Sequence, residues 1–477
     1  MKRTPSVLAG FAVMVAVVFT FAVCRYIWAT AYFYGDDYST LYFLRTKPLG
    51  EVLLIPLGSQ IVPLHRLLTL VVADIAPMNF AATLIALGAF HLLAIAYLYR
   101  TLELVRPSKV NVVLSSVYAT NMFFGFNFGW FSSGTTRFPY IAFSIATLFH
   151  FLRYRRTAMT KDLVFVCVCY LLALSFYSKG ILIPLYCACA DVATAPPAPA
   201  HGEERTRVGA YGVLGALLVC SAVYAPLVRR LLDANASRTN TSPRFLFEFV
   251  RLAWTTLLNG AVGNPLDVLS YNPNPVLVPA SLAFVGYSIW RSRRTAVAWL
   301  CLFALVTVNF LVVGVSNRTL LFGHVMAFEP RHFYELWFLV VLFVGIVLHA
   351  LPRDAPELAW LAAEKRLPVI AGVLALAFAA SAVAAFSAFT TLEERNYADV
   401  RQTRAFMRTL ERELDRVRVS ERTPFADSFL PPYLDPMDFE HRRISDLFVA
   451  MDVRAHFVPL DRARYRVSAN GHVERIR

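Results

Sequence analysis

Two adjacent carboxylates, Asp36 and Asp37, directly follow the first long apolar run, in the stretch YGDDY. A carboxylate at the edge of a bilayer is partly dehydrated, which raises its pKa and suits it to act as a general base. An ordinary solvated acidic turn is the alternative interpretation. Glu51 is the only other acidic residue before Asp74, so Asp36 and Asp37 are the candidate catalytic residues of this segment.

Basic and aromatic side chains recur in segments expected on the same side of the membrane as this pair. Arginine, lysine and histidine donate charged hydrogen bonds to phosphate oxygens, and a helix start adds backbone donors. The same side chains can instead anchor helix ends by reaching lipid headgroups, and the sequence leaves both interpretations open. The candidate substrate-binding residues are His65, Arg66, Lys179, Arg331, His332 and Tyr334.

The elements that must position these residues are membrane-spanning helices. The chain of 477 residues is 57% hydrophobic and only 16% charged, with a mean hydropathy of +0.53. Its apolar runs approach the roughly 20 residues that a spanning helix needs. This composition argues against a soluble enzyme, a disordered chain or a nucleic-acid binder. We expect a mainly α, polytopic membrane helix bundle of about 11 spans, at residues 6–30, 79–99, 110–126, 138–152, 162–176, 180–193, 209–228, 275–290, 295–315, 334–351 and 368–390.

The distribution of charge predicts the orientation of these spans. Residues 1–390 carry +13 of the net charge of +14, and basic residues in short connections mark the cytoplasmic side. The N-terminus is therefore expected in the cytoplasm and the C-terminus outside, in a multi-pass protein of the plasma or inner membrane. The expected outer segments are 31–78, which includes an amphipathic stretch at 61–77, then 127–137, a tight turn at 177–179, 229–274, 316–333 and the C-terminal tail.

The last part of the chain differs in composition. Residues 391–477 hold 16 arginines and 15 acidic residues, which is typical of a water-exposed domain. Apolar residues at helical spacing predict an amphipathic helix over 397–419, and Asn470-Gly471 predicts a hairpin turn. We expect a transmembrane domain at 1–390 and a small extracytoplasmic α+β domain at 391–477.

Six motifs follow one another along the chain: Asp36-Asp37, Pro63-x-His65-Arg66, His91 with the run that follows it, Trp130–Pro139, Ser178-Lys179-Gly180 with Pro184, and Arg331-His332. Taken in this order, they resemble the GT-C superfamily of integral-membrane glycosyltransferases, in particular its protein O-mannosyltransferase-like and related bacterial branches. The resemblance covers residues 1–190 and, more loosely, 316–345. The sequence departs from the family pattern at two places: Gly180 replaces the acid expected after the lysine, and His65-Arg66 replaces an Arg-Pro pair.

The resemblance implies a transferase that takes a sugar from a polyprenyl-phosphate donor to a hydroxyl on the extracytoplasmic face. It implies that Asp36 is the general base, and Asp37 is the second candidate for that role. It also implies a glycan, lipid or protein acceptor. It implies no cofactor, because most branches need no metal ion, although an oligosaccharyl-transferring branch does. Three alternatives stay open: a lipid-linked oligosaccharide polymerase or ligase, a transporter or flippase without catalysis, and a non-enzymatic scaffold.

Overall fold

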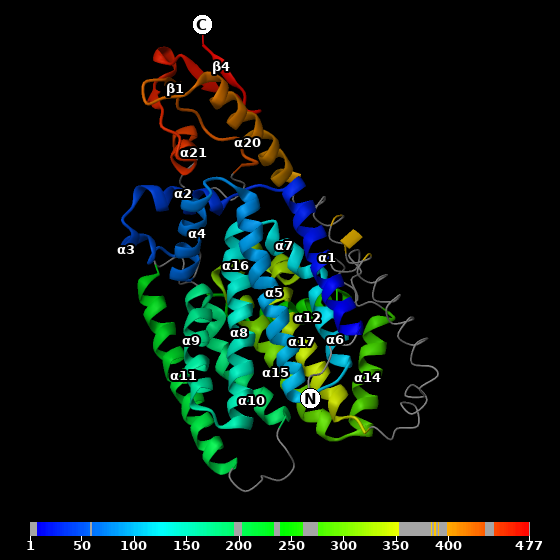
Figure 1. Cartoon of the computed structure of the whole chain (residues 1–477). Helices are drawn as coiled ribbons and strands as arrows, with labels where there is room; N and C mark the ends of the chain where they lie inside the picture. Colours follow the sequence, from blue (N-terminus) through cyan, green and yellow to red (C-terminus); the bar gives the residue numbers. More distant parts are fainter. Residues whose placement is uncertain are drawn as a thin grey trace.

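The chain folds into a mostly helical protein with a small mixed sheet near its C-terminus (Figure 1). The structure, a computed structural model, describes residues 7–57, 60–194, 203–232, 239–260, 275–352, 398–434 and 443–476, with single positions at 383, 386, 387 and 390.

The bundle combines long helices with short helical pieces between them. The longer helices are α1 (Val7–Thr30), α5 (Phe80–Val105), α6 (Val110–Ala119), α8 (Phe131–Thr157), α9 (Thr160–Phe176), α10 (Ile183–Thr194), α11 (Glu203–Leu231), α12 (Pro243–Gly260), α14 (Leu277–Arg291), α15 (Arg294–Gly314) and α17 (Pro330–Ala350). The connecting pieces are α2 (Asp36–Thr46), α3 (Leu49–Val52), α4 (Pro63–Ile75), η1 (Met122–Phe124), α7 (Gly125–Phe128), η2 (Ser178–Leu182), α16 (Asn317–Phe322) and η3 (Gly323–Phe328).

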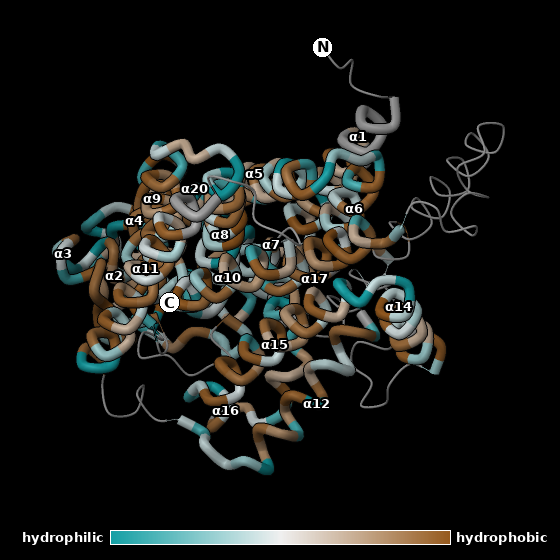
Figure 2. The backbone as a smooth tube through the Cα atoms, turned by 90° about the horizontal axis from the view of Figure 1, so that it is seen from below, coloured by the Kyte–Doolittle hydropathy of each residue, from teal (hydrophilic) through white to brown (hydrophobic). Residues whose placement is uncertain are grey.

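Four of the described helices are long and apolar enough to cross a bilayer, which is the composition of a membrane protein. They are Phe80–Val105, Val208–Leu231, Arg294–Gly314 and Pro330–Ala350. Figure 2 shows hydrophobic residues predominating along α15 and α17.

The expected count of about 11 spans is not confirmed. The apolar runs at 110–126, 180–193 and 275–290 form helices of only 10, 12 and 15 residues, below the roughly 20 needed to cross the hydrocarbon. An apolar run therefore does not fix helix length. The run at 368–390 lies almost entirely outside the described residues; within it, Phe386 packs against Phe19 and Tyr26 of α1.

Two segments expected as outer connections are largely helical. Residues 127–137 end α7 and form the first turns of α8, and the expected connection 229–274 contains α12. Helix α12 forms there because Phe249, Leu252 and Leu257 recur at helical spacing and are buried. The amphipathic stretch 61–77 is confirmed as a helix, since α4 occupies Pro63–Ile75.

Helix α8 lies at the centre of the bundle, packed between α5 and α9, and is buried along most of its length. Its many hydroxyls are tolerated there because they bond to the helix's own backbone. Ser144 and Thr147 each donate to the carbonyl four residues earlier, at 2.7 Å. Such bonds remove the cost of burying a hydroxyl in an apolar interior.

The C-terminal part of the chain carries the sheet, whose strands lie in the order β2-β1-β3-β4. The first three are parallel and β3–β4 is an antiparallel hairpin, which confirms the turn expected at Asn470-Gly471. Its elements are α20 (Ala398–Val417), β1 (Pro424–Ala426), α21 (Ile444–Ala450), β2 (His456–Val458), η4 (Leu460–Arg462), β3 (Tyr465–Val467) and β4 (Val473–Arg475). In Figure 1 this part sits above α2, and α21 packs on α2. The expected boundary at 390/391 stays a prediction.

Candidate functional site

The acidic pair opens α2 at the end of the bundle that carries the C-terminal sheet. Gly35 precedes the pair with φ of 56°, a left-handed backbone conformation that glycine adopts without a Cβ clash. The turn places Asp36 and Asp37 against the start of α8, where both carboxylates find their partners.

Asp37 is a structural anchor. Its Oδ2 accepts from the Tyr34 backbone N–H at 2.9 Å and its Oδ1 from the Ser132 backbone N–H at 2.8 Å. The side chain is fully buried, so it satisfies one of the unpaired N–H groups that every helix start exposes. Burial and the neighbouring Asp36 raise the pKa of Asp37 well above its usual value, while the two backbone donors act against that rise.

Asp36 has a different environment, because only one of its two carboxylate oxygens is bonded within the described residues. Its Oδ1 accepts from Trp130 Nε1 and from Ser132 Oγ, both at 2.6 Å. The residue is half-buried, and its Oδ2 has no hydrogen-bond partner among the described residues. A carboxylate that is fixed through one oxygen and open at the other can accept a further hydrogen bond or a proton.

Arg331 packs on Trp130, the residue whose indole N–H donates to the Asp36 carboxylate. Its guanidinium carbon is 4.4 Å from the centroid of the Trp130 ring, and its Nε is 3.4 Å from Glu329 Oε1. The Trp130 indole therefore bonds to Asp36 through its ring N–H and contacts the Arg331 guanidinium on its ring face. The structure thus places Arg331 near Asp36, and its expected role in substrate binding stays a prediction.

Arg66 and His65 approach from α4 and are both buried. Arg66 donates from Nη1 to Thr40 Oγ1 at 2.5 Å, and its Nε has no partner within the described residues. Burial lowers the pKa of Arg66 to about 10, and the negative charge of Asp36 acts in the opposite direction. Arg66 thus brings positive charge close to Asp36.

His65 supports this arrangement as a neutral side chain. Its Nδ1 is 2.7 Å from Thr135 Oγ1, and that hydroxyl bonds to the Phe131 carbonyl. Burial, helped by the adjacent Arg66, holds the pKa of His65 well below its usual value. A neutral histidine here links α4 to α8.

Lys179 is held in a buried ionic cluster. Its Nζ lies 2.5 Å from Glu335 Oε2, and Arg137 Nε lies 2.5 Å from Glu335 Oε1. The Nδ1 of His332 is 3.7 Å from the same carboxylate. Glu335 of α17 is therefore the acidic partner of both Lys179 and Arg137. A Cβ at Gly180 would lie 2.6 Å from the Cα of Leu174, so only glycine lets η2 pack this closely.

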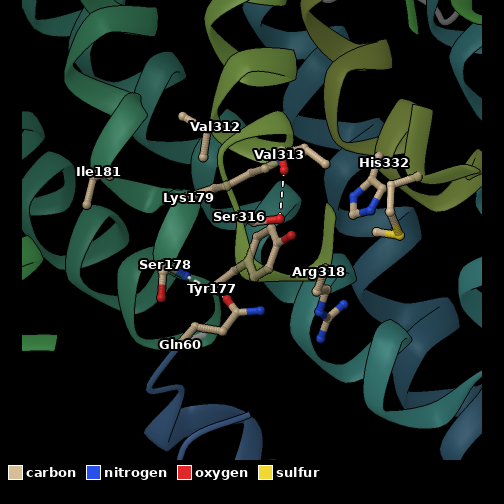
Figure 3. Close-up of a pocket in the computed structure, with 11 residues that line it drawn as sticks. Gln60, Tyr177, Ser178, Lys179, Ile181, Val312, Val313, Ser316, Arg318 and His332 are labelled. Carbon is tan, nitrogen blue, oxygen red and sulfur yellow. Dashed lines mark hydrogen bonds between the residues drawn. The ribbon is translucent and has the colours of Figure 1, made fainter. Parts of the chain in front are cut away.

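A cavity of about 160 Å³ opens beside this cluster. Figure 3 shows Arg318 and His332 on one side, Ser178 and Gln60 on the other, and Tyr177 between them. Arg318 makes no hydrogen bond or ion pair to any described residue. Desolvation and the nearby Arg331 lower the pKa of Arg318, whereas Asp36 raises it. An uncompensated guanidinium at a cavity is suited to bind an anion.

Tyr334 lies apart from the cavity, in the interior of the bundle. Its hydroxyl is 2.8 Å from His91 Nδ1 and 3.2 Å from the Tyr118 hydroxyl. The residue is fully buried and packed against Phe138. Its expected role in substrate binding stays a prediction, and its contacts are those of a packing residue.

Several site residues were given no role from the sequence, among them Trp130, Ser132, Arg318 and Glu335. Trp130 and Ser132 belong to a stretch interpreted as an outer turn, Arg318 lies inside an N-x-T match, and Glu335 follows the Arg331-His332 motif. The available signal was charge, since Arg318 and Arg331 are the only arginines in the short segment 316–333.

Within the described ranges, no three His, Cys, Asp or Glu side chains are grouped to hold a metal ion. A scan of protein-family models and a search of curated proteins found no match to this sequence. The functional argument therefore depends on the site geometry and on the resemblance of the motifs.

Proposed function

We propose that this protein is a membrane glycosyltransferase of the GT-C kind, which moves a sugar from a polyprenyl-phosphate donor to an acceptor hydroxyl. The observation that carries the proposal is Asp36: a half-buried carboxylate with one oxygen fixed by Trp130 and Ser132 and the other open. Reaction at this end of the bundle corresponds to the extracytoplasmic face in the predicted topology.

In the proposed reaction, Oδ2 of Asp36 accepts the proton of the acceptor hydroxyl. The hydroxyl oxygen forms a bond to the anomeric carbon, and the bond from that carbon to the phosphate oxygen breaks. The phosphate leaves with the electron pair. A single displacement of this kind inverts the anomeric configuration.

Charge on the departing phosphate grows in the transition state, and fixed cations stabilise it there. Arg318 is the best-placed group because it lines the cavity and forms no ion pair with a described acid. Arg331 and Arg66 lie near Asp36 as well. Lys179 contributes less to net charge because it is paired with Glu335. A donor that already carries its phosphate leaving group needs no nucleotide site.

The proposal is tested with purified protein in lipid vesicles. Polyprenyl-phosphate hexoses and pentoses serve as donors, and washed membranes from cells lacking the protein supply acceptors. We expect one donor to yield free polyprenyl phosphate together with an equal amount of transferred sugar. Movement of an intact lipid-linked sugar across the bilayer without its cleavage would favour a flippase and contradict the proposal.

A further inference from the structure

A second basic cluster lies away from the candidate site, where α20 meets the end of α1 (Figure 1). Two hydrogen bonds fix the junction: Arg401 Nη2 donates to the Tyr26 hydroxyl at 3.0 Å, and the Tyr32 hydroxyl donates to Glu411 Oε1 at 2.6 Å. Positions 401, 404, 408 and 411 share one face of a helix. Arg404 and Arg408 therefore lie between the two bonds, on the side of α20 turned toward α1.

Arg404 has no acidic partner among the described residues of this junction. The residue is only 7% exposed, and its Nη1 has no hydrogen-bond partner among the described residues. Burial and the like charges of Arg408 and Arg25 lower the pKa of Arg404 to about 10. The only acid between residues 401 and 411 is Glu411, and its carboxylate is bonded to Tyr32. A buried guanidinium without an acidic partner is costly unless an anion binds it.

The face of α1 that continues to this cluster is suited to contact lipid. Met14, Val18 and Phe21 are 55%, 59% and 69% exposed and follow one another at helical spacing. The same stripe then reaches Arg25, which is exposed and stacks on Trp28 at 4.7 Å. An apolar stripe ending in arginine and tryptophan is typical of the boundary between hydrocarbon and headgroups. The cluster is therefore at headgroup depth.

We propose that Arg25, Arg404 and Arg408 form a binding site for the phosphodiester of an anionic membrane lipid. The lipid chains lie along the exposed stripe of α1, and the headgroup phosphate accepts hydrogen bonds from the arginines. The bound lipid compensates the charge of Arg404 and ties α20 to the membrane domain. This site is independent of the glycosyltransferase proposal.

Thermal unfolding of the full-length protein in lipid-free detergent tests the site, with phosphatidylglycerol, phosphatidylcholine or inorganic phosphate added. A ligand that binds only the folded state raises the midpoint. We expect phosphatidylglycerol to raise it for wild type and to raise it far less for Arg404→Gln. Without lipid, Arg404→Gln should unfold at the wild-type temperature or above, because the substitution removes an unpaired buried charge.

Arg422→Gln is the matched control, since it removes an exposed arginine of the same C-terminal part and should keep the full response. Arg408→Gln changes an exposed side chain and should lose part of the response even if Arg404→Gln fails to fold. A full phosphatidylglycerol response in both cluster variants would overturn the proposal. An equal response of wild type to inorganic phosphate or to phosphatidylcholine would overturn the assignment to an anionic lipid.

Discussion

At the residue scale, the two adjacent carboxylates differ because of what α8 offers each of them. Asp37 accepts two backbone N–H groups and is buried, whereas Asp36 accepts two side-chain donors on a single oxygen. The same pair of residue types thus yields one anchor and one candidate base. Asp36→Asn should therefore affect chemistry, and Asp37→Asn should affect folding.

Arg318 should be the main cation for the donor phosphate. Replacing it by Gln removes a charged hydrogen-bond donor, an interaction worth about 1.5–3 kcal/mol. Steady-state kinetics of Arg318→Gln should therefore show kcat/KM for the donor reduced by roughly 10- to 100-fold. Arg244→Gln, an exposed arginine at the start of α12, is the control, and an equal loss in both variants would indicate only a general effect of surface charge.

His65 should make the folded protein sensitive to acid. Its pKa is depressed in the folded state, so below about pH 6.5 the unfolded chain binds a proton that the folded one does not. Stability should fall as pH drops through this window, by up to about 1.4 kcal/mol per pH unit for one group. Unfolding midpoints measured above and below the window should differ less for His65→Gln than for wild type.

The exposed His456 provides the control for this experiment. His456→Gln should keep the wild-type pH dependence. If His65→Gln shows the same dependence as wild type, His65 is already charged in the folded protein and the neutral assignment is wrong.

The sequence indicated the acidic pair and most of the cations near it, because charge in an apolar chain is conspicuous. It could not tell Asp36 from Asp37, since that depends on Trp130 and Ser132, which lie more than ninety residues further along. Arg318 was missed for a similar reason. An arginine in a short segment becomes informative only when the fold shows that it forms no ion pair with a described acid.

At the element scale, η2 must pack closely on α9 to hold Lys179 against Glu335. Gly180→Ala should destabilise the protein by about 1–3 kcal/mol, because the added methyl group overlaps the backbone of Leu174. The unfolding midpoint should drop and transferase activity should fall with it. Gly212→Ala in α11, where nothing lies within 4 Å of the added Cβ, should leave both unchanged; a similar drop there would mean that helix glycines matter generally.

Helices were predictable where apolar residues recurred at helical spacing over the full length of the segment, as for α4, α5 and α15. The connection expected at 127–137 was not predicted as helix, because Gly129, Ser132, Ser133 and Gly134 are typical of turns. The Asp37 carboxylate and the packing of neighbouring helices override that local preference, so tertiary contacts decide where α8 begins.

At the scale of the whole molecule, composition predicted the mainly helical bundle, and the Asn470-Gly471 turn predicted strands near the C-terminus. The number of spans was not predictable from the sequence, because an apolar run can form a helix that is buried in protein as well as one that crosses the lipid. Helices α8 and α17 are both largely buried, yet only α17 has the composition of a span.

The topology prediction follows from the basic connections. A tag inserted at residue 200 should be accessible only from the cytoplasm, and a C-terminal tag only from outside, in intact cells with permeabilised cells as the control. Finding both tags on the same side would contradict the orientation and place the candidate site differently relative to its donor.

The most direct test of the central claim is glycosyl transfer by Asp36→Asn, measured in membranes with matched protein levels and a polyprenyl-phosphate sugar donor. The amide keeps size and hydrogen bonding but is not a base. We predict that kcat falls by about 10²- to 10⁴-fold, with donor binding retained, while Glu51→Gln, an exposed acid at the same end, stays at the wild-type rate. Turnover by Asp36→Asn at the wild-type rate would contradict the account.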